Sequence, residues 1–184
     1  RLEVMAPRMR DRNVADSVHL DCAMQYRGGH VTALSGLEHL EGKSVGILAD
    51  GAVQAEREVK DGRITLDGPA SLVTVGLPYA ADLETMPVEI AMKDGTSVGR
   101  KKYINAVNVL FRDTVTARVG CSFSRLEEVP WRSMEPYGQP PVPYSGARRV
   151  IVPERARNMA GVCVRSDAPL PMTILAIMPE VEVK

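Results

Sequence analysis

The sequence has few of the residues from which binding and catalytic sites are built. Its 184 residues include only 3 cysteines, 3 histidines and 1 tryptophan. Cys22, Cys121 and Cys163 are far apart and form no C-x-x-C pair, so their spacing fits neither a disulfide framework nor a zinc site. We therefore expect three reduced thiols, buried or half-buried, in a reducing compartment. The sequence predicts no bound metal and no cofactor.

An excess of charge of either sign is also missing. Lys and Arg together number 23 and so do Asp and Glu, which gives a formal net charge of +0. Binding to DNA without regard to its sequence depends on an excess of basic residues that neutralise phosphates, so this class of function is disfavoured. The basic clusters, four arginines between Arg8 and Arg27 and the run Arg100-Lys101-Lys102, are interpreted as solvated faces.

Long apolar runs are missing as well. The most apolar stretch, residues 172–178, is far shorter than the roughly 20 residues of a membrane-spanning helix. The first residues lack the apolar core of a signal peptide. The sequence predicts a soluble protein without a membrane anchor. Because residue 1 is arginine and not methionine, we expect a processed product or a fragment of a longer chain.

The chain consists instead of short runs of alternating apolar and polar residues that are separated by turn residues. Four Asp-Gly pairs begin at Asp50, Asp61, Asp67 and Asp94, and this dipeptide favours the tight turns of β-hairpins. No apolar stripe with the helical period of 3.6 residues is present. The pattern predicts a mainly β fold with little helix. Residues 37–40 are predicted to form one helical turn or a tight loop, and residues 154–159 one short helical turn.

The predicted strands fall into three regions. Residues 1–30 are predicted to form an N-terminal arm or strand that joins an antiparallel β-sandwich. Residues 31–78 contain about five short strands and are predicted to form a small β-barrel, inserted in the sandwich or packed beside it. Residues 79–184 are predicted to form the sandwich itself, with Cys121 in its core and a proline-rich loop at residues 130–145.

Several groups of residues resemble parts of known sites, but their spacing excludes them. Gly42-Lys43-Ser44 ends like a phosphate-binding loop, yet Leu37 stands where that motif needs glycine, and a strand is predicted to follow instead of a helix. His19, His30 and His39 have no metal-ligand spacing and are interpreted as surface or capping residues.

Catalytic residues are not predicted either. Asp16, Ser17, His19 and Asp21 lie along one extended segment and cannot converge into a triad, and no G-x-S-x-G motif is present. The aspartates of the Asp-Gly pairs are explained by turn geometry. A pair of catalytic carboxylates from distant strands stays open. The sequence nevertheless favours a protein that is not an enzyme.

One set of residues is distinctive as a string. It runs Gly36-Leu37-Glu38-His39-Leu40-Glu41-Gly42-Lys43-Ser44-Val45, then Leu48-Ala49-Asp50-Gly51, Gly62-x-Ile64-Thr65-Leu66 and Val75-Gly76-Leu77-Pro78-Tyr79. Further members are Asp21-x-x-Met24-x-Tyr26, Arg100-Lys101-Lys102 and residues 169–180. The set resembles the C-terminal part of the tail nozzle (tail tubular) proteins of short-tailed bacteriophages and prophages. It covers most of the chain but consists of turn and core residues.

The resemblance implies a structural virion protein of the virion tail, made in the cytoplasm of the host bacterium. It implies a homo-oligomeric ring, a hexamer, that contacts adjacent tail and adaptor proteins and conducts DNA during ejection without binding it tightly. It also implies that residues 34–77 resemble the first half-domain of ubiquitin-activating enzymes, in fold alone. Complete nozzle proteins are longer and contain propeller-like repeats, so this chain would be a C-terminal fragment or a shortened relative.

A carbohydrate- or receptor-binding β module is the alternative function. Such a module needs an exposed aromatic platform, for which the candidates are Trp131, Tyr137 and Tyr144 in the proline-rich loop. Trp131 is also interpretable as a cap over the core. A hydrolase assembled from distant acidic residues ranks third.

Overall fold

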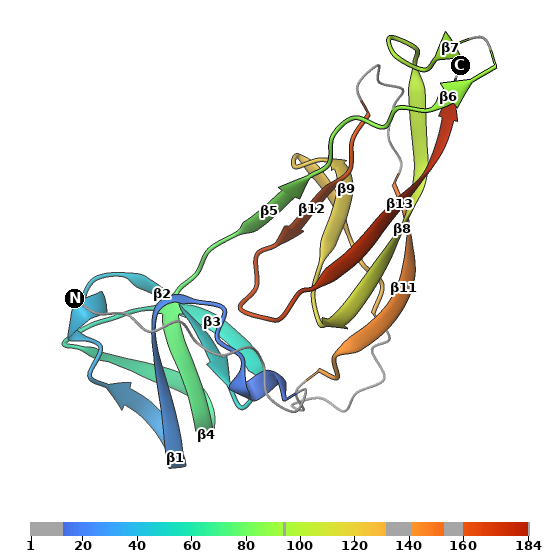
Figure 1. Cartoon of the computed structure of the whole chain (residues 1–184). Coiled ribbons are helices and arrows are strands. Elements are labelled where there is room, and N and C mark those ends of the chain that lie inside the picture. Colours follow the sequence, from blue (N-terminus) through green and yellow to red (C-terminus); the bar gives the residue numbers. More distant parts are fainter. Residues whose placement is uncertain (1–12, 94, 132–140, 153–159, 184) are drawn as a thin grey trace. The chain divides into compact units, whose positions relative to one another are not determined.

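The computed structural model describes residues 13–93, 95–131, 141–152 and 160–183 (Figure 1). Of the residues that the structure describes, 62% lie in strands and 4% in helical turns, so the fold is mainly β. The described helical residues form two 3-10 turns, η1 (Val14–Asp16) and η2 (Glu38–Leu40). The predicted mainly β fold with little helix is confirmed, and η2 is the turn expected at residues 37–40. The turn expected at 154–159 lies outside the described residues.

The chain forms two compact units. The first contains the described residues up to Ala80 together with residues 141–143 and 167–171, and the second contains the other described residues. This division differs from the predicted boundary at residue 30. Residues 21–30 belong to a strand whose backbone pairs within the first unit, so they do not form an arm that joins a sheet of the second unit.

The first unit contains one antiparallel sheet with the strand order β1-β4-β2-β3. Its strands are β1 (Asp21–Ser35), β2 (Ser44–Ala49), β3 (Ala52–Glu58) and β4 (Arg63–Leu77). β1 and β3 lie at opposite edges of this sheet and are not paired with each other, so the described strands form no closed barrel. The barrel expected over residues 31–78 is therefore an open sheet in the structure.

β1 and β4 remain paired along their whole length because their irregularities compensate. The paired residues run Ser35–Arg63, Ala33–Thr65, Val31–Ala70, Arg27–Leu72, Met24–Val75 and Asp21–Leu77. Followed from Ser35–Arg63 toward Asp21–Leu77, the pairing first meets extra residues in β4, around Asp67-Gly68. It then meets the same number of extra residues in β1, around Gly28-Gly29 and at Cys22, whose φ is 51°. The predicted turn at Asp67-Gly68 is wrong, because these residues form a bulge within β4.

Two other Asp-Gly pairs form the predicted turns. Asp50 and Gly51 have φ values of 47° and 85° and connect β2 to β3. Asp61 and Gly62 have φ values of 53° and 64° and connect β3 to β4. Positive φ at both central residues is the geometry for which Asp-Gly is favoured in two-residue hairpin loops. Asp94, from the fourth pair, lies outside the described residues.

The core of the first unit contains residues of the η2 turn and of the strands before and after it. Leu37 and Leu40 contact residues from β2 and β4 in one buried cluster. The cluster consists of Leu34, Leu37, Leu40, Val45, Ile47, Ala49, Val59, Ile64, Ala70, Val73 and Val75. The stretch that opens the resemblance therefore contributes both turn residues and core residues.

The second unit contains a four-stranded sheet of order β10-β9-β12-β5, a three-stranded sheet of order β11-β8-β13, and the pair β6-β7. All pairings are antiparallel. The strands are β5 (Ala81–Glu84), β6 (Ala91–Met92), β7 (Gly95–Thr96), β8 (Lys102–Thr114), β9 (Arg118–Ser122), β10 (Arg125–Glu128), β11 (Tyr144–Ile151), β12 (Cys163–Ser166) and β13 (Ile174–Val183).

Residues from both larger sheets meet in the core of the second unit. The period-two alternation of residues 101–115 predicts Val107, Val109 and Phe111 on one face, and β8 contributes these three residues to the core. β9 contributes Val119 and Cys121. The expected core position of Cys121 is thus confirmed. The other buried members are Ile104, Ala117, Val129, Val150, Val152, Ala160, Val162 and Val164.

The same alternation predicts Ile104 on the face opposite Val107, and this prediction is wrong. Glu180 of β13 pairs with Ala106, but the next residue, Val181, pairs with Ile104. Asn105 is therefore an extra residue in β8 that reverses the alternation, because each inserted residue moves the following side chains to the other face. Ile104 consequently joins the core, and Lys102, two residues earlier, is completely buried.

Replacement of Gly76 by alanine is predicted to destabilise the first unit. An added Cβ would lie 2.7 Å from the Asp21 carbonyl oxygen and 2.9 Å from Leu20 Cβ. Backbone cannot move aside as a flexible side chain can, so we expect a loss of about 1–3 kcal/mol in the free energy of unfolding, measured by urea denaturation.

Gly68→Ala is the matched control on the same strand. No atom lies within 4 Å of the Cβ position at Gly68, so we expect a change within about 0.5 kcal/mol. Equal effects of the two substitutions would contradict the close approach of β1 to Gly76.

Candidate functional site

Two of the three aromatic residues predicted as a ligand platform come together in the second unit. The ring centroids of Trp131 and Tyr144 are 5.9 Å apart, and Trp131 meets Phe111 of the core edge-on at 5.2 Å. The Arg148 guanidinium lies 3.9 Å from the centre of the Tyr144 ring. The third candidate, Tyr137, lies outside the described residues.

Trp131 is partly buried and packs against the core, as expected of a cap. Tyr144 donates its hydroxyl hydrogen to the carbonyl oxygen of Ala147 at 3.0 Å. The buried donors Trp131 Nε1 and Arg148 Nε have no hydrogen-bond acceptor within the described structure. An unsatisfied buried donor costs about 1–3 kcal/mol, so an acceptor from outside the described residues would stabilise this cluster.

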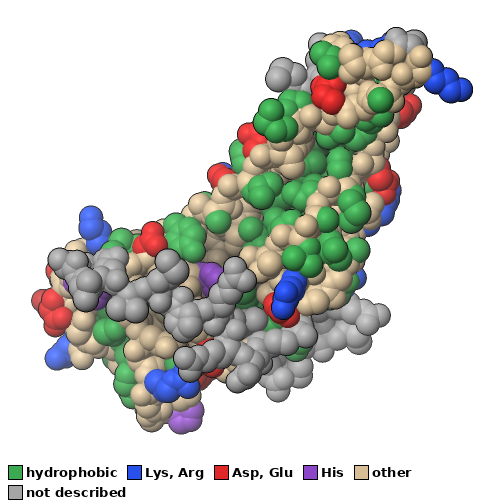
Figure 2. All heavy atoms as spheres, in the orientation of Figure 1, with side chains coloured by type: hydrophobic (Ala, Val, Ile, Leu, Met, Phe, Trp, Pro, Cys, Tyr) green, Lys and Arg blue, Asp and Glu red, His purple; other side chains and the backbone are tan. Residues whose placement is uncertain are grey.

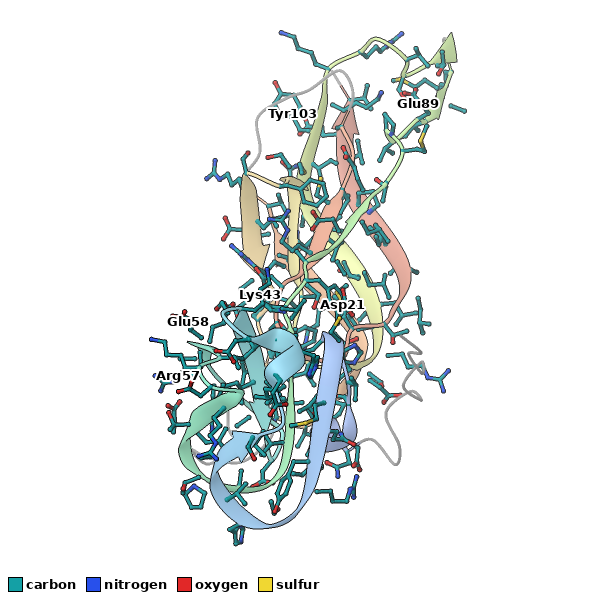
Figure 3. The ribbon with its side chains drawn as sticks, turned by 90° about the vertical axis from the view of Figure 1, so that its left-hand side faces the viewer. Asp21, Lys43, Arg57, Glu58, Glu89 and Tyr103 are labelled. Carbon is teal, nitrogen blue, oxygen red and sulfur yellow. The ribbon has the colours of Figure 1, made fainter. Side chains whose placement is uncertain are left out.

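The Gly42-Lys43-Ser44 segment is part of a loop that leads into a strand. Ser44 is the first residue of β2, and its hydroxyl donates to Glu56 Oε2 at 2.7 Å. Lys43 is exposed beside this strand (Figure 3). The prediction that a strand follows this segment is confirmed, so the helix N-terminus that would hold a phosphate in such a loop is not formed here.

The histidines occupy three different environments in the first unit. His19 is half-buried, and this burial lowers the pKa of its imidazole. His30 is exposed on β1, and His39 is exposed with Nε2 3.1 Å from the Cys22 carbonyl oxygen. In the described part of the chain no three His, Cys, Asp or Glu side chains are arranged to hold a metal ion.

The cysteines are thiols, as expected: Cys22 is half-buried, and Cys121 and Cys163 are buried. Cys121 belongs to the core of the second unit. Cys22 packs against the core of the first unit at the bulge of β1.

Asp50 connects the β2–β3 turn to β4 through its carboxylate. Oδ1 accepts hydrogen bonds from the backbone N–H of Leu72 at 2.8 Å and from the Ser71 hydroxyl at 3.0 Å, and both carboxylate oxygens lie 3.1–3.2 Å from the Ser71 nitrogen. Burial alone would raise the pKa of Asp50. The hydrogen bonds from Leu72 and Ser71, with the charge of His30, outweigh this and lower it.

Glu180 is the centre of a polar group that crosses the three-stranded sheet. Arg149 of β11 donates to both its carboxylate oxygens, Nε to Oε1 at 2.8 Å and Nη2 to Oε2 at 2.7 Å. Asn108 of β8 donates to Oε1 at 2.9 Å. These hydrogen bonds, those from Arg149 first, lower the pKa of Glu180 to about 2. Glu180 in turn raises the pKa of Arg149.

A similar clamp joins β5 to β12 in the other sheet. Arg165 donates from Nε and Nη2 to the two carboxylate oxygens of Asp82, both at 2.7 Å. The hydrogen bond from Arg165 lowers the pKa of Asp82. Asp82 and Arg165 are also partners in the backbone register of the two strands. The bidentate pair therefore reinforces a contact between strands that are far apart in the sequence.

The most deeply buried charge is that of Lys102. Its side chain is 0% exposed, and Nζ donates to Glu89 Oε1 at 3.1 Å. The buried Ser97 hydroxyl donates to Glu89 Oε2 at 3.3 Å and accepts from the Ile90 backbone N–H at 2.9 Å. Glu89 lies near Tyr103 at one end of the unit (Figure 3). This group attaches the β6–β7 segment to the start of β8.

Sequence reasoning did not find these polar clamps. Asp82 and Arg165 are 83 residues apart, and Glu180 is 72 residues from Asn108. No local spacing reports such contacts, because the pairing of distant strands brings the residues together. The charge alternation of the strands was the one available signal, and it does not identify partners.

Comparisons with known proteins add no assignment to this geometry, since no family model and no curated protein matches the sequence significantly. The structure itself defines the class as a mainly β protein with antiparallel sheets. In the described residues no helix is long and apolar enough to cross a bilayer. The polar geometry described above joins strands to one another and does not gather around a common point.

Replacement of Asp50 by alanine is predicted to weaken the first unit by about 1–3 kcal/mol, because the donors of Ser71 and Leu72 lose their charged acceptor. Asp50→Asn is the control, since asparagine keeps an acceptor oxygen and tolerates positive φ. We expect a smaller loss for this variant in urea denaturation at neutral pH. Equal losses would show that a neutral acceptor oxygen at this position does not stabilise the turn.

The stability of the second unit is predicted to depend on pH through Glu180. Because its pKa is lowered from 4.5 to about 2 in the folded protein, its contribution is present above 4.5 and is lost as the pH falls toward 2. We expect Glu180→Gln to reduce the change in melting temperature over this range. Glu182→Gln, which removes the same charge from the same strand, should leave that change nearly intact. An unaltered pH profile in Glu180→Gln would contradict the assignment.

Proposed function

We propose that this chain is a structural virion protein, part of a tail nozzle ring that conducts DNA during ejection. The observation that carries the proposal is the place of the resembling residues in the fold. Gly36, Gly42, Gly51 and Gly62 all have positive φ, between 64° and 91°. The shared string therefore coincides with positions where the backbone requires glycine, which supports a shared fold and not a chance match.

The finer architecture belongs to the same proposal. The second unit would be an antiparallel β-sandwich, since two sheets contribute to one core. The first unit would be similar in fold to the small half-domain of ubiquitin-activating enzymes. In this unit the strands would curve toward a barrel without closing it. The compensating bulges of β1 and β4 support this, because bulges increase the local twist and bend of strands.

The charge distribution also supports a conduit. The formal net charge of +0 gives no overall attraction to phosphates. Acidic and basic side chains from different strands of one sheet neutralise each other in pairs, as in Arg149–Glu180 and Arg165–Asp82. A channel wall with these properties would let DNA slide, whereas a basic wall would retain it.

A carbohydrate- or receptor-binding module is the second candidate, favoured by one observation. Trp131 Nε1 and Arg148 Nε are buried donors without acceptors among the described residues, and the Trp131 and Tyr144 rings are tilted against each other at 56°. A sugar hydroxyl or carboxylate could supply the acceptor. The half-burial of Trp131 against Phe111 weighs against this candidate, because a ring that packs on the core offers less surface to a sugar.

The two candidates predict different locations and different ligands. Antibody labelling and particle reconstruction of virions that contain this chain should place it in the tail, as a ring around the DNA path. Placement elsewhere in the particle would overturn the nozzle proposal. On a glycan array we expect no binding, and binding that is lost in Trp131→Ala but kept in Tyr79→Ala, a control for an exposed aromatic residue, would favour the second candidate.

A further inference from the structure

The three-stranded sheet of the second unit has two edges with complementary chemistry. β8 is its central strand, and β11 and β13 each pair with β8 alone among the described strands. Unpaired edge strands expose backbone donors and acceptors that can pair with another chain. Figure 2 shows hydrophobic side chains gathered over this unit, in the region where β8 and β13 lie in Figure 1.

The β13 edge is apolar in its first half and acidic in its second half. Leu175 and Met178 are 56% and 46% exposed, and residues 174–178 carry no charge. Glu180 and Glu182 follow after Pro179. Proline has no N–H and is tolerated on an edge strand, so new backbone pairing along this edge would use residues 174–178.

The β11 edge is apolar and basic. Ile151, its last residue, is 67% exposed, and Arg148 and Arg149 precede it. Arg149 already shows the attraction between the two edges, because within one copy it reaches across β8 to Glu180.

The two edge strands run in the same direction, and residues of both pair with the same positions along β8. Both strands are antiparallel to β8, so they run parallel to each other. Asn108 pairs with Arg149 on one side and Met178 on the other, and Ala106 pairs with Ile151 and Glu180. If the sheet continued from one copy into another at the same level, Met178 would lie beside Arg149 of the next copy and Glu180 beside its Ile151.

The other sheet edges are less suited to pairing with a second chain. β3 ends in Glu56-Arg57-Glu58, β10 is Arg125-Leu126-Glu127-Glu128, and β5 carries Asp82 and Glu84. β1 is interrupted by bulges. Charges and bulges are the usual means by which edge strands avoid association. Residues 174–178 of β13 have neither a charge nor a proline, although a register irregularity lies between Ile174 and Ala176.

We propose that β13 of one copy pairs with β11 of the next copy, so that the three-stranded sheets of neighbouring copies join into one continuous sheet. The contact is head-to-tail, because it uses two different surfaces of the same chain. Such contacts form a ring where the rotation between copies closes, and an open filament where it does not. The occupant of the β13 edge is therefore a second copy of this chain. This inference rests on the proposed function, for which it names the contact that builds the ring.

The test uses one variant for each edge. Met178→Arg places a positive charge on β13 beside Arg149 of the next copy. Ile151→Glu places a negative charge on β11 beside Glu180 of the preceding copy. Both side chains are exposed, so each unit should fold normally, which circular dichroism would verify. Since like charges at an interface cost several kcal/mol, we expect each variant to self-associate at least about tenfold more weakly than the unaltered chain in sedimentation velocity.

A mixture of the two variants distinguishes this contact from a symmetric one. Each variant keeps one intact edge, so the mixture should form pairs limited to one copy of each variant, although neither assembles by itself. Val53→Glu, at a 46% exposed apolar position on β3, is the control and should assemble like the unaltered chain.

The possible outcomes separate the two proposals. If the unaltered chain assembles and both edge variants assemble equally well, the β13–β11 contact is wrong. The ring would then have to form through another surface of the chain. If only Met178→Arg weakens assembly, the contact joins two β13 edges and the head-to-tail arrangement is overturned. If the unaltered chain remains a monomer at all concentrations, self-assembly of this chain is overturned, and the contact with it.

Discussion

The register between paired strands is the constraint on which the rest of the structure depends. Side chains alternate between the two faces of a sheet, so one inserted residue exchanges the buried and exposed sets of everything that follows. In β1 and β4 the insertions on one strand equal those on the other, and the pairing at Ser35–Arg63 and at Asp21–Leu77 is kept over 15 residues. The core residues Leu34 and Val75 are therefore buried at opposite ends of the same pair of strands.

In β8 the insertion at Asn105 is matched by one extra residue of β13 between Ile174 and Ala176, and its consequence at the start of β8 is chemical. It places Lys102 on the buried side, where an ammonium group without a partner would be costly. Glu89 supplies that partner, and Ser97 holds the Glu89 carboxylate. A single bulge thus explains why a charged residue is buried and why the segment that contains β6 and β7 is attached to β8.

The sequence predicted the elements well and their tertiary relations poorly. Turn chemistry identified Asp50-Gly51 and Asp61-Gly62, and alternation placed Val107, Val109 and Phe111 in a core. Both signals are local. Asp67-Gly68 failed because the same dipeptide suits a bulge as well as a hairpin, and only the partner strand decides between them. The boundary at residue 30 failed for a related reason, since the pairing of β1 with β4 joins residues about 50 positions apart.

The polar clamps show why a site search by motif had little to find in this chain. Arg149, Asn108 and Glu180 come from three strands whose order along the sheet, β11-β8-β13, differs from their order in the sequence. Their effect is to hold the two edge strands at fixed levels relative to β8. A sheet with fixed levels can present Met178 and Glu180 on one edge at the heights of Arg149 and Ile151 on the other. The same pairing that stabilises one copy therefore also determines which residues of the two edges would meet in a repeated head-to-tail contact.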